Sequence, residues 1–292
     1  MIGLALLLTV AGIAAAPCRM PVPDGMVERR APFGGVIAPT AAQADEAVLA
    51  GRVAQAAAVR YLGLDALSFL ITPAPASERE ACPFVFHWRF PVRPDGGSRL
   101  PTHVLPHEIG HALFIRFLAP RTDADEYGGG APDWLDEMAA IAFEDAAGTR
   151  IRRADAHRHA ERGALIPLAR LLAMRHPQWT PDPASVAADP MARGRLASAP
   201  LVSRDTPAFY ATVRALFDFL VARTGDERIV RTLADRFRDG VPLGAWLRTH
   251  ADPGSGGSER TFAALDAALA TYVLTDPDYA AASRPLAPGS SR

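Results

Sequence analysis

Two histidines four residues apart, with a glutamate next to the first, are the residues of this chain best suited to chemistry. They lie in the segment His107-Glu108-Ile109-Gly110-His111. On a helix, positions i and i+4 lie on one face, so both imidazoles can bind one metal ion. Glu108 can reach a water on that metal and act as its general base. The segment therefore indicates metal-assisted hydrolysis.

The helix expected to carry this segment is apolar on nearly all sides. Between Leu105 and Leu118, only Arg116 is polar apart from the motif itself. A helix that is apolar all round is usually buried, and buried ionisable side chains need partners. A metal ion would be such a partner; two hydrogen-bonded core histidines are the alternative. Pro106 suits the first turn of a helix, which predicts that the motif begins near the helix N-terminus.

A catalytic zinc normally has three protein ligands and one open position, so a third ligand is needed. In the metzincins a glycine and then a histidine follow the second histidine, but Phe114 and Phe117 stand at those positions here. In the aspzincins an aspartate precedes a Tyr-Gly pair. Tyr127 and Gly128 form such a pair, but Ala124 stands at the ligand position.

Glu137, 26 residues after His111, is the better candidate for the third ligand. It lies in the segment Asp133-Trp134-Leu135-Asp136-Glu137-Met138-Ala139-Ala140. Here the sequence resembles the gluzincin metallopeptidases, a group that includes the peptidase MA-like bacterial proteins. In these proteins a second helix carries a Trp-Leu-x-Glu-x-x-Ala pattern, and its glutamate is the third zinc ligand. The resemblance implies that His107, His111 and Glu137 hold Zn²⁺. A surface glutamate on an amphipathic helix is the alternative, and Asp136 is expected to be solvated.

Two further residues are candidates for the site. Glu144 lies seven residues after Glu137, two turns along the same face of the expected helix. The family often has an acidic residue there, and we expect Glu144 to accept the free ring N–H of His107 or His111. Tyr210 opens a stretch that resembles a family helix, and it is a candidate donor to the oxyanion. A solvated carboxylate and a packed, half-buried tyrosine are the respective alternatives.

The resemblance extends over residues 101–245, closely at the two motifs and loosely elsewhere. The stretch from Ile166 to Pro177 also looks like the family. Two positions depart from the pattern. Val213 stands where a small polar residue is often found three residues after Tyr210, and Thr224 replaces an aromatic residue before a glycine.

The rest of the chain favours a predominantly helical α+β fold, and the resemblance implies a zincin-like domain. A small N-terminal sheet, drawn from residues 60–100, would pack over the motif helix, and its edge strand could bind extended peptide. Residues 17–39 are rich in Pro and Gly and predict an irregular lead-in. The other expected elements are a helix from Thr40 to about Arg60, strands within 66–72 and 82–92, a turn at 95–98, five or six helical segments after residue 102, and loops at 178–207 and 252–258.

We predict three parts: a signal peptide over 1–16, a single domain over 17–275 and a disordered tail over 276–292. Within the domain, residues 17–100 form an α/β part and 101–275 a helical part with the metal site. The first sixteen residues are apolar, shorter than the roughly 20 needed to span a membrane, and end in three alanines suited to cleavage. The chain is therefore expected to be exported, to the periplasm or the medium. An uncleaved N-terminal anchor or a lipid on Cys18 is the alternative.

Composition narrows the functional classes. The 292 residues are 49% hydrophobic with a net charge of −1, which argues against disorder and against a nucleic-acid binder. All 31 basic residues are arginine, which we interpret as the coding bias of a GC-rich bacterial genome. The arginines between Arg150 and Arg162 are accordingly expected to be solvated and to take no part in the site. Export would permit a disulfide between Cys18 and Cys82; two unpaired thiols are the alternative.

The sequence as a whole predicts a zinc metallopeptidase that acts on a peptide or protein substrate. Glu108 would take a proton from the metal-bound water and pass it to the leaving amine. The alternative is an exported binding or scaffold protein with a vestigial or structural metal site. That alternative is motivated by the departures at Val213 and Thr224, and it predicts a metal closed off by a fourth protein ligand.

Overall fold

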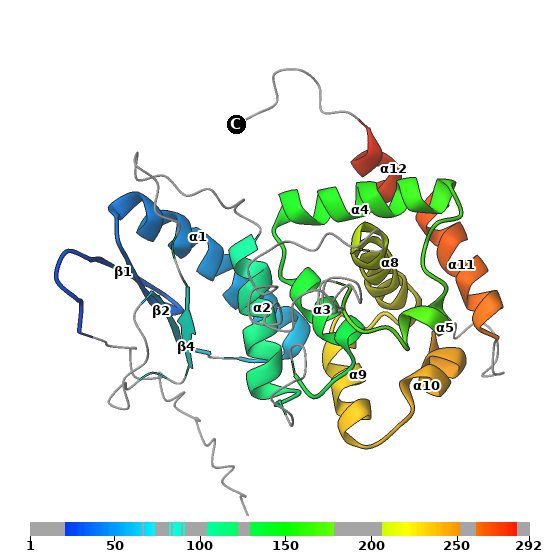
Figure 1. Ribbon diagram of the computed structural model, residues 1–292, viewed down its shortest axis with the longest axis horizontal. Helices are drawn as coiled ribbons and strands as arrows, with labels where there is room; N and C mark the ends of the chain where they lie inside the picture. The colour runs from blue at the N-terminus through cyan, green and yellow to red at the C-terminus, as the bar shows by residue number, and fades with distance from the viewer. Residues whose placement is uncertain are drawn as a thin grey trace, which may run out of the picture. The chain divides into compact units, whose positions relative to one another are not determined.

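A computed structural model describes residues 21–65, 67–73, 82, 84–88, 90, 104–121, 129–177, 206–251 and 261–284. Within these ranges the chain is predominantly helical with one four-stranded sheet (Figure 1), which confirms the α+β class. The chain divides into two compact units, Met1–Val48 with Asp65–Ser98, and Leu49–Leu64 with Arg99–Arg292. In this division residues 49–64 belong to the same unit as the residues after 98. A single domain over 17–275 stays a prediction.

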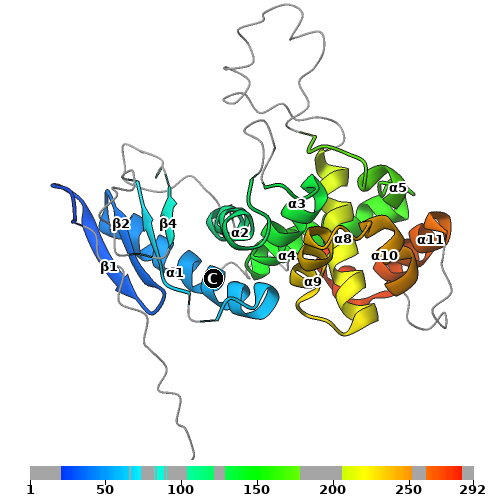
Figure 2. The ribbon, with the colours of Figure 1, turned by 90° about the horizontal axis from the view of Figure 1, so that it is seen from below.

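The first unit contains the sheet, in the order β1-β2-β3-β4. The hairpin of β1 (Val27–Ala31) and β2 (Gly34–Ala38) is antiparallel, whereas β3 (Phe69–Thr72) pairs in parallel with β2 and with β4 (Phe84–His87). All four residues of β3 are buried, as expected of a strand with parallel neighbours on both sides. β4 is the edge strand on the other side from β1 (Figure 2).

The irregular lead-in expected over residues 17–39 is wrong where the structure describes it, because β1 and β2 occupy most of 27–38. β1 is short and largely polar, and β2 begins with two glycines, so neither shows a strand pattern on its own. The pairing of β2 with the buried strand β3 stabilises a strand that the local sequence does not predict. Strands β3 and β4 lie within the two ranges predicted for them.

The helix predicted from Thr40 is present as α1 (Ala41–Ala57), which continues into the π-helical turn η1 (Ala58–Leu62). The Thr40 hydroxyl accepts the backbone N–H of Gln43 at 3.2 Å, the bond of an N-terminal cap. Gly63 ends η1 in the left-handed conformation with φ 63°, which suits a residue without a Cβ.

The helical unit is built around two buried helices, α3 (Asp133–Ala142) and α8 (Thr206–Thr224). Every residue of α3 from Trp134 to Ala142 is buried, and α2 and α8 both pack against it. In Figure 2 the view is along α2, with α3 beside it. The other described helices of this unit are α2 (Val104–Phe117), α4 (Ala146–Glu161), α5 (Leu168–Leu171), α9 (Ile229–Arg238), α10 (Leu243–His250), α11 (Phe262–Thr275) and α12 (Pro277–Ser283).

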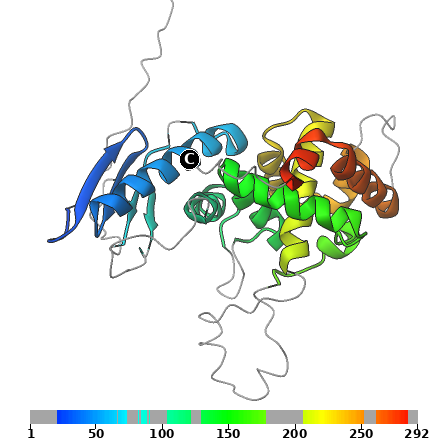
Figure 3. The ribbon, with the colours of Figure 1, turned by 90° about the horizontal axis from the view of Figure 1, so that it is seen from above.

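The disordered tail predicted from residue 276 is wrong for its first part, because Pro277–Ser283 forms helix α12. Figure 3 shows α12, in red, against α4, in green. Asp276 caps α12 by accepting the N–H of Asp278 at 2.9 Å, and the ring of Tyr279 is buried. The buried ring of Tyr279 and the ion pair of Asp278 with Arg153 on α4 hold this helix in place, a combination that composition does not reveal.

Several predictions concern residues that lie outside the described ones: the signal peptide, the turn at 95–98, most of the loop at 178–207 and the loop at 252–258. Among the residues that are described, no helix combines the length and apolarity required to cross a membrane. Cys82 is disulfide-bonded, and Cys18 is outside the described residues.

Candidate metal centre

Helix α2 carries the two histidines and begins at Val104, so the motif starts in its first turns, as Pro106 predicted. Gly110, which lies between the two histidines, allows α2 to pack closely against α3. A Cβ at Gly110 would lie 2.9 Å from Cα of Ala140 and 3.0 Å from the ring of Phe143. Only a glycine therefore allows α2 and α3 to lie this close together, which sets the histidines against α3.

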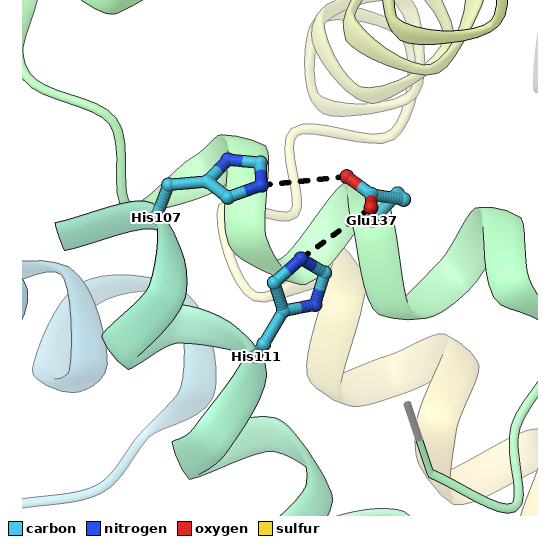
Figure 4. Close-up of side chains that lie close together, drawn as sticks. All are labelled: His107, His111 and Glu137. Carbon is cyan, nitrogen blue, oxygen red and sulfur yellow. Dashed lines mark ion pairs between the residues drawn. The ribbon is translucent and has the colours of Figure 1, made fainter. Parts of the chain in front are cut away.

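His107, His111 and Glu137 converge between the two helices (Figure 4). His107 Nε2 lies 3.5 Å from one carboxylate oxygen of Glu137, and His111 Nε2 lies 3.4 Å from the other. One ligand atom from each residue lies within 4.8 Å of the others. Two imidazole nitrogens and one carboxylate oxygen are the ligands of many catalytic zinc sites, so these residues fit a zinc ion.

The other ring nitrogen of each histidine contacts a carboxylate. His107 Nδ1 lies 3.1 Å from Glu144 Oε1, the contact predicted for Glu144. His111 Nδ1 lies 3.1 Å from Asp136 Oδ2. A carboxylate behind a ligating imidazole fixes the ring and directs its opposite nitrogen toward the metal. Both Nε2 atoms are therefore directed at Glu137.

Asp136 was expected to be solvated, and this is wrong, because the residue is 0% exposed. The reason is that α3 is buried on all sides, so its adjacent residues Asp136 and Glu137 both face α2 side chains. Glu144 also differs from expectation in its location. Helix α3 ends at Ala142, so Glu144 reaches His107 from the short connection to α4 rather than from the face of a longer helix.

The carboxylates create an environment that favours positive charge between the two rings. Burial alone would lower the pKa of His111, but Asp136 and Glu137 raise that pKa well above its usual range. Burial alone would raise the pKa of Glu137, yet the charge of His111 and hydrogen bonds from His111 and His176 hold it well below its usual range. The site is thus arranged to hold an ionised carboxylate next to a cation.

Arg152 on α4 corrects the expectation that no arginine takes part in the site. Its Nε donates to Glu144 Oε1 at 3.0 Å, and its guanidinium lies over the ring of Tyr210, 4.2 Å from the ring centre. Despite its burial, Glu144 has a lowered pKa because His107 donates to it and Arg152 adds positive charge. Arg152 thus joins the carboxylate behind His107 to the candidate oxyanion donor.

Tyr210 lies on α8, with its ring centre 6.2 Å from that of His107. Burial and the negative charges of Glu137, Glu108 and Glu144 raise the pKa of its phenol, outweighing Arg152, so the hydroxyl keeps its proton. Glu108 is half-buried on α2, next to His107 in the sequence.

His176 is a third site residue, after Asp136 and Arg152, for which the sequence predicted no role. It follows α5 and is fully buried, and its Nε2 lies 3.1 Å from Glu137 Oε1 and 3.2 Å from the Tyr210 hydroxyl. Its backbone N–H donates to Asp133 Oδ2 at 2.6 Å, which ties its loop to the start of α3. The only sequence signal was its place in the loosely family-like stretch that ends at Pro177.

Comparisons with known proteins found no match: no family model, no curated protein and no solved structure is similar to this chain.

Proposed function

We propose that this protein is a zinc-dependent metallopeptidase of the gluzincin type, with a zincin-like arrangement of its helical unit. One observation carries the proposal. Two imidazoles four residues apart on α2 and a carboxylate on α3 present their ligand atoms to one point, and each imidazole has a carboxylate at its other nitrogen. A neutral imidazole donates a hydrogen bond from only one of its nitrogens, so carboxylate oxygens beside both nitrogens of each ring favour a cation between the rings and Glu137.

His107, His111 and Glu137 would hold the ion, and Glu144 and Asp136 would fix the two rings. When bound, zinc supplies Lewis acidity, which polarises the scissile carbonyl and makes water a nucleophile at neutral pH. Glu108 takes a proton from the attacking water on a carboxylate oxygen. It then gives that proton to the amine nitrogen as the C–N bond breaks. Tyr210 donates its hydroxyl hydrogen to the carbonyl oxygen as negative charge develops there.

The substrate of this reaction would be a peptide or protein, and the chain would act after export, in the periplasm or outside the cell. The disulfide at Cys82 supports an oxidising compartment. A structural metal site would need a fourth protein ligand. Among the described residues, the group that could hold a metal has three members, which favours an open catalytic site over a closed one.

The test uses the mature chain, the Glu108→Gln variant and a peptide library. We expect about one zinc per chain in both proteins by elemental analysis, and hydrolysis that falls by about 10²–10⁴-fold in the variant. A wild-type chain without stoichiometric metal contradicts the proposal. Full activity in the variant removes Glu108 from the role of base, and bound zinc without hydrolysis in the wild type supports the scaffold alternative.

A further inference from the structure

The buried ring of His176 contacts two functional groups of the candidate site with one nitrogen. Nε2 lies 3.1 Å from Oε1 of Glu137 and 3.2 Å from the hydroxyl of Tyr210. The ring is held edge-to-face against Phe209, with 5.3 Å between ring centres, and its backbone is held by Asp133. These contacts fix the ring and leave its nitrogen facing the metal centre.

The chemistry of the two partners determines where the proton on His176 must lie. A carboxylate that ligates a metal can only accept hydrogen bonds. A bare Nε2 at 3.1 Å from Glu137 Oε1 would place two lone pairs against each other, so Nε2 carries the hydrogen and donates it to Glu137. A protonated Nε2 cannot accept from Tyr210. The hydroxyl hydrogen of Tyr210 is therefore directed to an acceptor other than His176.

We propose that His176 is a positioning residue with two effects, a claim that rests on the proposed function. It holds the Glu137 carboxylate in the orientation that binds the metal, and it turns the Tyr210 hydroxyl so that its hydrogen points to the substrate oxyanion. One imidazole thus couples the third metal ligand on α3 to the oxyanion donor on α8. The guanidinium of Arg152, on helix α4, lies over the face of the Tyr210 ring and fixes the same phenol.

Two substitutions separate hydrogen bonding from packing. His176→Leu keeps an apolar side chain against Phe209 but has no donor, whereas His176→Gln keeps an N–H that can reach Glu137. We expect His176→Leu to weaken zinc binding by about 10–100-fold and His176→Gln to stay closer to the wild type. A packing role alone predicts the opposite order. Zinc affinity is measured by competition with a chelator, and folding is checked by far-UV circular dichroism.

The kinetic readout tests the effect on Tyr210. With zinc saturating, Tyr210→Phe should lower kcat by about 10²–10³-fold, with zinc affinity unchanged. The same exchange should cost less when made in His176→Leu, because the hydroxyl is already misdirected there. The matched control is His250→Gln on α10, whose ring stacks on Trp246 with 4.8 Å between ring centres; it should change neither quantity.

The outcomes distinguish this inference from the proposed function. If the wild type binds zinc and cleaves peptides while both His176 variants keep its affinity, the inference is wrong and the proposed function stands. If the wild type binds no zinc, both are wrong. Should His176→Leu not fold, His176→Asn replaces it, because its shorter amide cannot reach Glu137. Equal zinc affinities of the Asn and Gln variants would then overturn the inference.

Discussion

Two clusters of buried charged side chains lie in the helical unit, and they differ in how their charges balance. The first joins α4, α8 and α12. Arg153 and Arg214 both donate to the carboxylate of Asp218, at 2.9 and 3.1 Å, and the Tyr279 hydroxyl donates to it at 2.9 Å. Arg153 also pairs with Asp278 at 2.8 Å, at the exposed edge. The positive charges of these two guanidinium groups are therefore balanced by the negative charges of the two carboxylates, all within the chain.

The second cluster is the candidate metal centre, where negative charge is in excess. Asp136, Glu137 and Glu144 are all buried around the two motif histidines. Among the described residues, Arg152 is the cationic side chain paired with them. Among the described residues, the buried carboxylates of this cluster outnumber the arginine paired with them.

The difference shows what each cluster needs. The balanced cluster requires only its own side chains, and its role is to hold α12 and α4 on α8. The unbalanced cluster requires positive charge from outside the chain or from protonated histidines. Burying several ionised carboxylates without such compensation is costly. An excess of buried carboxylates around imidazoles is thus a physical argument for added positive charge, from a metal ion or from protons on the rings, and it is independent of the sequence motif.

The largest expected effect lies in the balanced cluster. Asp218→Ala leaves two arginines buried without their carboxylate, and we expect a loss of about 3–5 kcal/mol in the free energy of unfolding. Urea denaturation measures this. The control is Asp235→Ala, which breaks partly exposed pairs with Arg231 and Arg238 and should cost no more than about 1 kcal/mol. Similar losses in both variants would mean that Asp218 is not part of a coupled buried cluster.

The second effect separates the clusters by their response to zinc. At a hundredfold excess over its Kd, zinc should raise the free energy of unfolding of the wild type by about 2.7 kcal/mol. Asp218→Ala should keep this gain, and Glu137→Gln should lose it, because only the second variant removes a ligand. Denaturation with and without zinc measures both. If zinc stabilises Glu137→Gln as much as the wild type, the claim that zinc binds at the second cluster is contradicted.

A smaller effect concerns the carboxylates behind the histidines. Asp136→Ala frees the ring of His111 to rotate, and we expect zinc affinity to fall by about 10–100-fold. Chelator competition gives the affinity. Glu161→Ala, an exposed carboxylate on α4, is the control and should bind zinc like the wild type. An unchanged zinc affinity in Asp136→Ala would mean that the 3.1 Å contact between Asp136 and His111 has no effect on metal binding.

The smallest effect is the pH dependence of the balanced cluster. Burial opposes ionisation of Asp218, but Arg214 and Arg153 lower its pKa below the ordinary value of 3.8. The folded chain then binds a proton here less readily than the unfolded chain. The cluster's stabilisation is therefore present above about pH 4 and is lost as the pH falls further. Between pH 6 and pH 3 the wild type should lose more stability than Asp218→Asn; parallel losses would contradict this assignment.

Local rules predicted the parts of this molecule that depend on local spacing. The helical period placed His107 and His111 on one face, and the Thr40 cap set the start of α1. Each of these two features is encoded within a few turns of helix, where geometry leaves few alternatives. Glu137 was expected only because its segment resembles the gluzincin metallopeptidases.

The remaining site residues depend on contacts between distant segments. His176 lies 39 positions beyond Glu137, and no spacing rule connects them. Asp136 was assigned to solvent because a helix usually has an exposed face, and α3 has none. The role of Arg152 was not predicted, because every basic residue of the chain is an arginine and no single arginine stands out. These roles follow from how α3, α4 and α8 pack, which sequence periodicity does not specify.

The most direct test of the metal centre is a crystal of the mature protein grown with zinc, with data collected on both sides of the zinc absorption edge. The proposal predicts one anomalous peak about 2.0–2.2 Å from Nε2 of His107, Nε2 of His111 and a carboxylate oxygen of Glu137. His176 should contact Glu137 and not the ion. The absence of a peak there, or a zinc that has His176 as a fourth protein ligand, would contradict an open catalytic centre.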